Sequence, residues 1–182
     1  MKFVLYSGLC LVFASVTLAA VSKPQVAQLE ATFKAFESCG FKLSTALDSN
    51  EKLIQKLAGP KGAKLFAEIS ETIVVLNETI YGAWDQLVAV ATDAQAIAIG
   101  TNVKTISDAT CKLYTDAAAA IKAKSLANFK SAVALYVKSS SLASRTLINV
   151  LNGMKNVDAK NVSDEVLELV NIASKLKNAL GV

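Results

Sequence analysis

The stretch LFAEISETIVVLNETIYGAWDQLVAVATDA, residues 65–94, decides the fold class. Its apolar residues recur at steps of three and four, the period of one face of an α-helix. The acidic residues of the stretch fall on the opposite side. A long amphipathic helix is therefore predicted from about residue 63 to residue 99, with Gly100-Thr101-Asn102 as its end. The apolar stripe consists of Leu65, Ile69, Ile73, Leu76, Ile80, Trp84, Leu87, Ala91 and Ala94.

Apolar residues with the same spacing continue on both sides of this stretch. They predict a first helix over residues 25–58, which the breaker Gly59-Pro60-Lys61-Gly62 ends. They also predict a helix over residues 103–124 and another over residues 125–152, with Asn152-Gly153 as a C-terminal stop.

The C-terminal part of the chain predicts a linker and a final helix. Residues 155–162 are polar and have the composition of a linker. Ser163 follows as a candidate N-cap, with Asp164 and Glu165 in a first turn where acidic side chains suit the helix dipole. No sustained alternation of polar and apolar residues predicts a strand. The expected fold is all-α, an antiparallel bundle of four to six amphipathic helices.

The first twenty residues have the pattern of a secretory signal peptide. Met1-Lys2 is a short basic start, and residues 3–20 carry no charge. Thr17-Leu18-Ala19 places small residues three and one before a cut, so the mature chain is expected to begin at Ala20 or Val21. The alternative is an uncleaved membrane anchor, because a run of this length approaches that of a bilayer span.

Removal of residues 1–20 would leave residues 21–182 as one helical-bundle domain outside the cell. The longest later stretch without charge, residues 94–103, is too short to span a bilayer. We therefore expect no transmembrane segment in the mature chain. The pattern does not specify an oligomeric state.

Two cysteines, Cys39 and Cys111, follow the signal peptide. An even number in an oxidising compartment predicts one disulfide, with intermolecular pairing or two buried thiols as the alternatives. In an up-down bundle the bridge would clamp the first and third predicted helices together as neighbours. A catalytic cysteine is not expected, because the chain contains no His to activate it.

Two stretches match the N-glycosylation acceptor pattern, Asn77-Glu78-Thr79 and Asn161-Val162-Ser163. The better candidate is Asn161, because it lies in the predicted polar linker. Asn77 lies inside a predicted helix, near the edge of its apolar stripe, and either carries a glycan or is simply a polar side chain.

The composition argues against most enzymatic and nucleic-acid functions. The chain has 182 residues. None of them is His, and this absence excludes a Ser-His-Asp triad and imidazole metal ligands. No Gly-rich phosphate loop appears, and we expect no catalytic residue, metal site or cofactor. The net charge of +4 is small, and the lysines are scattered along the sequence, so no nucleic-acid partner is expected. Tyr81 and Trp84 are candidates for lining a ligand cavity, but Trp84 lies on the apolar stripe and core packing is expected.

The composition and short motifs of the chain resemble those of a known family. A signal peptide, a helical body rich in Ala, Lys and Leu, two sequons and helix-borne cysteines resemble the small secreted insect proteins of the TsetseEP-like type. The cysteines stand in Ser38-Cys39-Gly40 and Thr110-Cys111-Lys112-Leu113-Tyr114. This resemblance covers the mature chain in style only. It implies no activity and supplies no site residues.

Two functions from different classes remain. The first is a secreted, non-enzymatic helical protein that binds a protein partner or forms part of an extracellular fluid or layer. The alternative is a carrier of a lipid or another apolar ligand, because amphipathic helices can enclose a cavity or open onto a lipid surface. A hydrophobic share of 53% motivates the carrier hypothesis, while an aromatic share of 7% and the lack of a clear polar anchor for a head group count against it.

Overall fold

A computed structural model describes residues 21–182 of the chain, with Asp48 described in its backbone only. The predicted signal peptide, and with it the predicted cut before Ala20 or Val21, lies outside the described residues. The helices α1 (Lys23–Val90), α2 (Asp93–Lys122), α3 (Leu126–Gly153) and α4 (Val157–Leu180) account for nearly all of that range. The prediction of an all-α fold is confirmed.

The long helix α1 consists of two antiparallel arms, arm 1 (residues 23–58) and arm 2 (residues 60–90). The chain reverses at Gly59, whose φ of 70° and ψ of 168° are the only non-helical angles inside α1. A residue without Cβ adopts this positive φ at no steric cost, and Pro60 then presets the φ of the first residue of arm 2. The predicted breaker is therefore the tip of a helical hairpin, and the bundle contains five helical segments, as expected.

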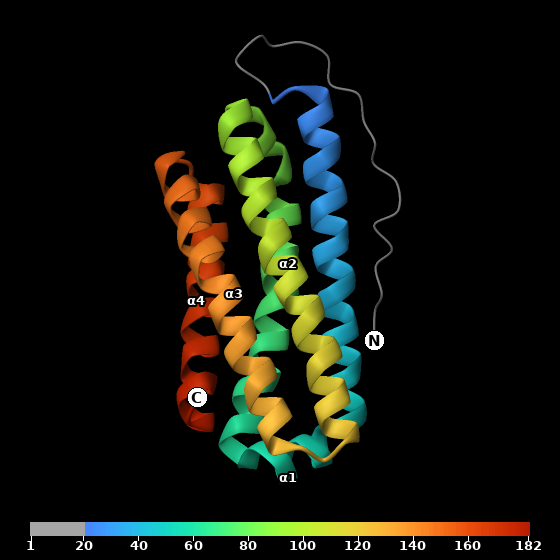
Figure 1. Cartoon of the computed structure of the whole chain (residues 1–182). Coiled ribbons are helices and arrows are strands. Elements are labelled where there is room, and N and C mark those ends of the chain that lie inside the picture. The colour runs from blue at the N-terminus through green and yellow to red at the C-terminus, as the bar shows by residue number, and fades with distance from the viewer. Residues whose placement is uncertain (1–20) are drawn as a thin grey trace.

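The five segments alternate in direction along one common axis (Figure 1). Helix α2 packs against α1 and α3, and α4 also packs against α1 and α3. Arm 2 and α3 meet across the bundle, where the rings of Phe66 and Phe129 form an edge-to-face pair with centroids 5.1 Å apart. Arm 2, α2, α3 and α4 thus form a four-helix bundle, and arm 1 packs on its outside against arm 2 and α2.

The two arms of α1 keep a constant register. Moving three or four residues forward along arm 1 leads to a contact three or four residues earlier in arm 2. The ring of Phe33 meets Trp84 edge-on, and Glu37 accepts a hydrogen bond from Tyr81. One turn further, Gly40 lies against Ile73 and Asn77. The hairpin is held together along its length and not only at its tip.

The boundary between the second and third predicted helices was predicted wrongly. Arm 2 ends at Val90 and α2 begins at Asp93, because Thr92 forms a reciprocal capping box with Gln95. The two hydrogen bonds, 2.9 and 3.2 Å long, satisfy backbone donors that a helix start otherwise leaves unpaired. Gly100, the expected stop, lies inside α2. Its missing Cβ leaves room for Leu29 of arm 1, whose Cδ2 would stand 3.2 Å from a Cβ at this position.

The start of the last helix was also predicted wrongly. Residues 155–162 are not a linker, because α4 begins at Val157. Asn156 is the N-cap, and its Oδ1 accepts hydrogen bonds from the backbone N–H groups of Asp158 and Ala159 at 2.8 and 3.0 Å. Ser163, the expected N-cap, is buried within α4. The true cap adds nearly two turns to the helix.

We expect Gly40→Ala to destabilise the protein by about 1 to 2 kcal/mol, although alanine favours helix formation. A Cβ at position 40 would stand 2.7 Å from Cγ2 of Ile73, a β-branched side chain that cannot move the methyl without changing rotamer. The matched control is Gly82→Ala on the exposed side of arm 2, where an added Cβ meets nothing within 4 Å.

Chemical unfolding of both variants checks this prediction. Gly82→Ala should gain about 0.5 to 1 kcal/mol of stability from helix propensity alone. If Gly40→Ala gained stability to the same extent, the close approach of the two arms at this level would be wrong.

Candidate functional site

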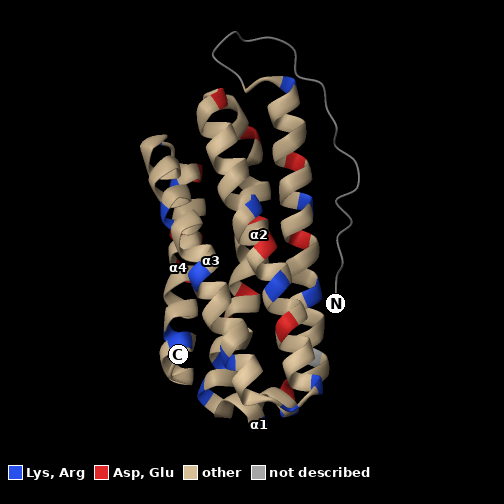
Figure 2. Cartoon of the chain, viewed as in Figure 1, with Lys and Arg blue, Asp and Glu red and all other residues tan. Residues whose placement is uncertain are grey.

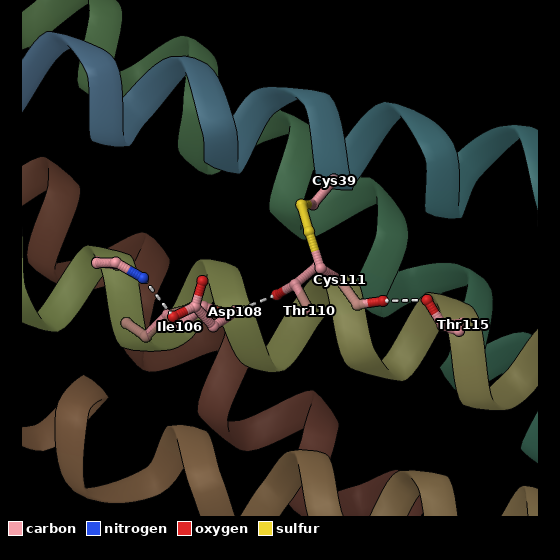
Figure 3. The surroundings of a disulfide bond; sticks show 7 residues. Cys39, Ile106, Asp108, Thr110, Cys111 and Thr115 are labelled. Atoms are coloured by element: carbon pink, nitrogen blue, oxygen red, sulfur yellow. Dashed lines mark hydrogen bonds and ion pairs between the residues drawn. A yellow bond between two sulfur atoms is a disulfide. The ribbon is translucent and has the colours of Figure 1, made fainter.

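The two cysteines form a disulfide between arm 1 and α2 (Figure 3). Their Cα atoms lie 5.0 Å apart, within the range that a bridge requires. Arm 1 and α2 run in the same direction and are neighbours, as the sequence predicted. The side chain of Cys39 is buried, and next to Cys111 the Thr110 hydroxyl donates to the Ile106 carbonyl at 2.9 Å. The bridge therefore fixes the outer helix of the bundle to its core.

The two predicted glycosylation sites lie in contrasting surroundings. Asn161 is exposed on α4, within a helix and not in a linker. Asn77 is only 6% exposed and faces arm 1, and its Oδ1 has no hydrogen-bond partner among the described residues. A glycan on Asn77 would have to replace the contact between the two arms. Glycosylation at both positions stays a prediction, and the packing favours Asn161.

Tyr81 and Trp84 connect the two arms of α1. The Tyr81 hydroxyl donates to Oε2 of Glu37 at 3.0 Å, and Trp84 meets Phe33 at 5.4 Å between ring centroids. Partial burial raises the pKa of Tyr81 to about 12, helped by the hydrogen bond to Glu37 and the negative charges of Glu37 and Glu30. The phenol therefore stays protonated, and remains a donor, throughout the physiological pH range.

Lysines gather at the end of the bundle where α1 reverses (Figure 2). The α2–α3 turn and the C-terminus of α4 reach the same end (Figure 1). A Cβ at Gly62 would lie 3.4 Å from Leu180, and one at Gly181 would lie 4.0 Å from Nζ of Lys130, which confirms that these segments meet there. We call this region the basic end. Its members are Lys52, Lys56, Lys61, Lys64, Lys122, Lys124, Lys130, Lys175 and Lys177.

Few carboxylates balance these lysines. Lys64 forms an ion pair with Glu68 at 3.6 Å, and the other lysines of the basic end have no ion pair with any side chain that the structure describes. Asp116, the nearest acidic residue of α2, is paired with Lys112 at 2.9 Å. Most of these ammonium groups are exposed. The basic end therefore presents positive charge that is not neutralised within the described chain.

An apolar groove opens at the same end, between the two arms of α1. Its volume is about 310 Å³. Leu47, Ile54, Pro60, Ala63 and Ala67 give it an apolar lining, which the polar side chains of Glu51, Gln55 and Lys64 complete. A groove of this size, apolar inside and with Lys64 and Glu51 in its polar part, fits part of an amphipathic molecule.

Exposed apolar side chains lie among the lysines. Leu53 of arm 1 is 36% exposed, Leu126 at the start of α3 is 41% exposed, and Val182 after α4 is 37% exposed. They come from three segments that meet at the basic end. Positive charge, an apolar groove and exposed apolar side chains are thus combined on one surface.

The basic end was not predicted from the sequence. The lysines of the basic end look scattered along the sequence. In the structure they lie beside the α1 reversal, the α2–α3 turn and the C-terminus of α4. In an up-down bundle alternate turns fall at the same end, so lysines on both sides of Gly59, around residue 123 and near the C-terminus meet in space. Applied to the predicted helices, this rule would have predicted the basic end from the sequence.

Among the side chains that the structure describes, no group of three His, Cys, Asp or Glu gathers as it would to hold a metal ion. No helix within residues 21–182 is both long and apolar enough to cross a membrane. Comparison with family models, curated proteins and solved structures gives no match for this chain. The resemblance to TsetseEP-like proteins stays a prediction.

Proposed function

We propose that this chain is a secreted, non-enzymatic helical protein that acts by binding a partner through its basic end. One observation carries the proposal: the unneutralised lysines of a mildly basic chain are concentrated at one end, beside exposed apolar side chains. Such a surface attracts a negatively charged partner over a distance and then offers apolar contacts.

Two further features support this proposal. The interior of the bundle is filled by large apolar side chains, including Ile69, Ile73 and Phe129, each fully buried. The filled core leaves little space for a ligand, so we expect a partner to bind at the surface. The disulfide fits an oxidising compartment and holds the outer helix in place when a partner is bound.

Native mass spectrometry of protein purified from its own source, combined with lipid extraction, tests the proposal. We expect an anionic protein or lipid to co-purify at low ionic strength and to dissociate as salt is raised, because salt screens exposed charges. Recovery of a bare protein at low ionic strength, without any bound component, would contradict binding as its role.

A second candidate function is the transport of an apolar ligand in the groove of the α1 hairpin. The groove of about 310 Å³ favours it, and Lys64 supplies the polar anchor that the sequence did not reveal. Its size matches part of an acyl chain better than a whole lipid.

Substitution of Ala67, a half-buried residue of the groove, tests the carrier function. A phenylalanine at this position should occupy the groove and weaken binding of a fluorescent fatty acid on the order of tenfold. The matched control is Ala89→Phe at the exposed far end of arm 2, which should leave the affinity unchanged. Equal affinities for both variants and the parent protein would exclude the groove as the ligand site.

A further inference from the structure

We infer that the basic end docks end-on onto an anionic lipid surface. This inference rests on the proposed function and names its partner. The relevant lipid is one with a negatively charged head group, presented in a membrane or a lipid particle. Its contact surface consists of the α1 reversal, the α2–α3 turn and the C-terminus of α4.

The charge of the basic end supplies the attraction. A lysine near an anionic bilayer strengthens binding about fivefold, and several act together when they reach the surface at once. Lys52 and Lys56 precede the reversal of α1, Lys61 follows it, and Lys122 ends α2. All four are exposed. Their positions on different segments spread the charge across the whole end of the bundle, as contact with a flat surface requires.

The apolar side chains distinguish a lipid surface from a simple polyanion. Leu53, Leu126 and Val182 are exposed at the same end, where a nucleic acid or an acidic peptide chain would leave them in water. At a bilayer they can enter the boundary between head groups and acyl chains while the lysines stay at head-group level. The apolar groove between the arms adds a place for part of an acyl chain.

The opposite end of the bundle carries charges of both signs. Asp93 begins α2, Asp158 lies in the first turn of α4, and Asp85 lies near the end of arm 2. Lys23 and Lys155 lie at the same end, so charges of both signs offset one another there. The unbalanced positive charge at the basic end therefore favours an orientation with the bundle axis standing on the anionic surface.

Vesicle co-sedimentation of the disulfide-bonded protein tests the inference. The vesicles consist of phosphatidylcholine, either alone or with about 30 per cent phosphatidylserine. The test variant is Lys52→Gln with Lys56→Gln and Lys122→Gln. The matched control, Lys23→Gln with Arg145→Gln and Lys155→Gln, loses the same charge from exposed positions in the other half of the bundle.

We expect the protein to bind the anionic vesicles and not the neutral ones, and to dissociate as salt is raised. The test variant should lose affinity on the order of a hundredfold, and the control variant less than about fivefold. Equal losses in the two variants, equal binding to both vesicle types, or tighter binding to a DNA oligonucleotide than to anionic vesicles would overturn the inference. Failure to bind vesicles, together with an anionic protein recovered from the natural source, would refute lipid docking and leave the proposed function standing.

Discussion

Replacing both cysteines, Cys39→Ser with Cys111→Ser, is expected to lower the free energy of unfolding by about 4 kcal/mol. The bridge joins residues separated by 72 positions, so it removes many conformations from the unfolded chain. For a chain of this size, such a loss corresponds to a fall in Tm of about 8 to 16 °C. Helicity at low temperature should be retained, because the core of the bundle does not depend on the bridge.

Thermal unfolding followed by circular dichroism, with and without a reductant, measures this effect. The reductant should lower the Tm of the parent protein to that of the double variant and leave the double variant unchanged. Peptide mapping without reduction provides the second readout. Free thiols at both positions, or a bridge between Cys39 residues of two chains, would show that arm 1 is not clamped to α2 in the way described.

Phe129→Ala is expected to lower the free energy of unfolding by about 3 to 5 kcal/mol. Phe129 is fully buried and meets Phe66 edge-to-face, so the truncation removes a contact between arm 2 and α3 and leaves a cavity in the middle of the bundle. The matched control is Phe41→Ala. Phe41 is 70% exposed on arm 1, and its truncation should cost less than about 0.5 kcal/mol.

Urea unfolding of the two variants gives the comparison. The free energies of unfolding of the two variants should depend on urea concentration with the same slope but with different midpoints. This result would show that the variants differ in stability and not in the surface that unfolding exposes. Equal midpoints would contradict the placement of Phe129 at the centre of the core and of Phe41 on its outside.

The sequence predicted the fold class and the long-range disulfide because both depend on strong signals. The apolar stripe from Leu65 to Leu87 has one regular period, and its residues are buried as expected except for Trp84, which is partly buried. Each of the two cysteines has only the other as a possible partner among residues 21–182. These signals need no knowledge of how the helices pack.

The helix boundaries were harder to predict. The hydrogen bond from an N-cap side chain to the backbone, and not the residue type alone, decides where each helix begins. Gly100 and Ser163 have the residue types of a helix stop and a helix cap, yet both lie inside helices. Thr92 and Asn156, whose side chains reach free backbone N–H groups, set the real starts. Glycine at position 100 leaves room for the close approach of Leu29, a tertiary contact that the local sequence does not reveal.

The basic end was not predicted because it depends on topology. Lys52 and Lys122 lie far apart in the sequence and on different helices. Only the alternating direction of the segments brings the reversal of α1 and the end of α2 to the same end of the bundle. The groove has the same origin. Its lining comes from both arms of α1, and it exists because the chain reverses at Gly59.

Quenching of tryptophan fluorescence by brominated lipids in anionic vesicles tests most directly that the basic end is the binding end. Leu53→Trp places a reporter there, and Val157→Trp places one at the opposite end, in both cases at an exposed apolar position. Trp84, partly buried between the arms, provides the common background in both variants. We predict strong quenching of the Leu53→Trp signal and little quenching of the Val157→Trp signal. Equal quenching of the two reporters, or stronger quenching at position 157, would contradict the account.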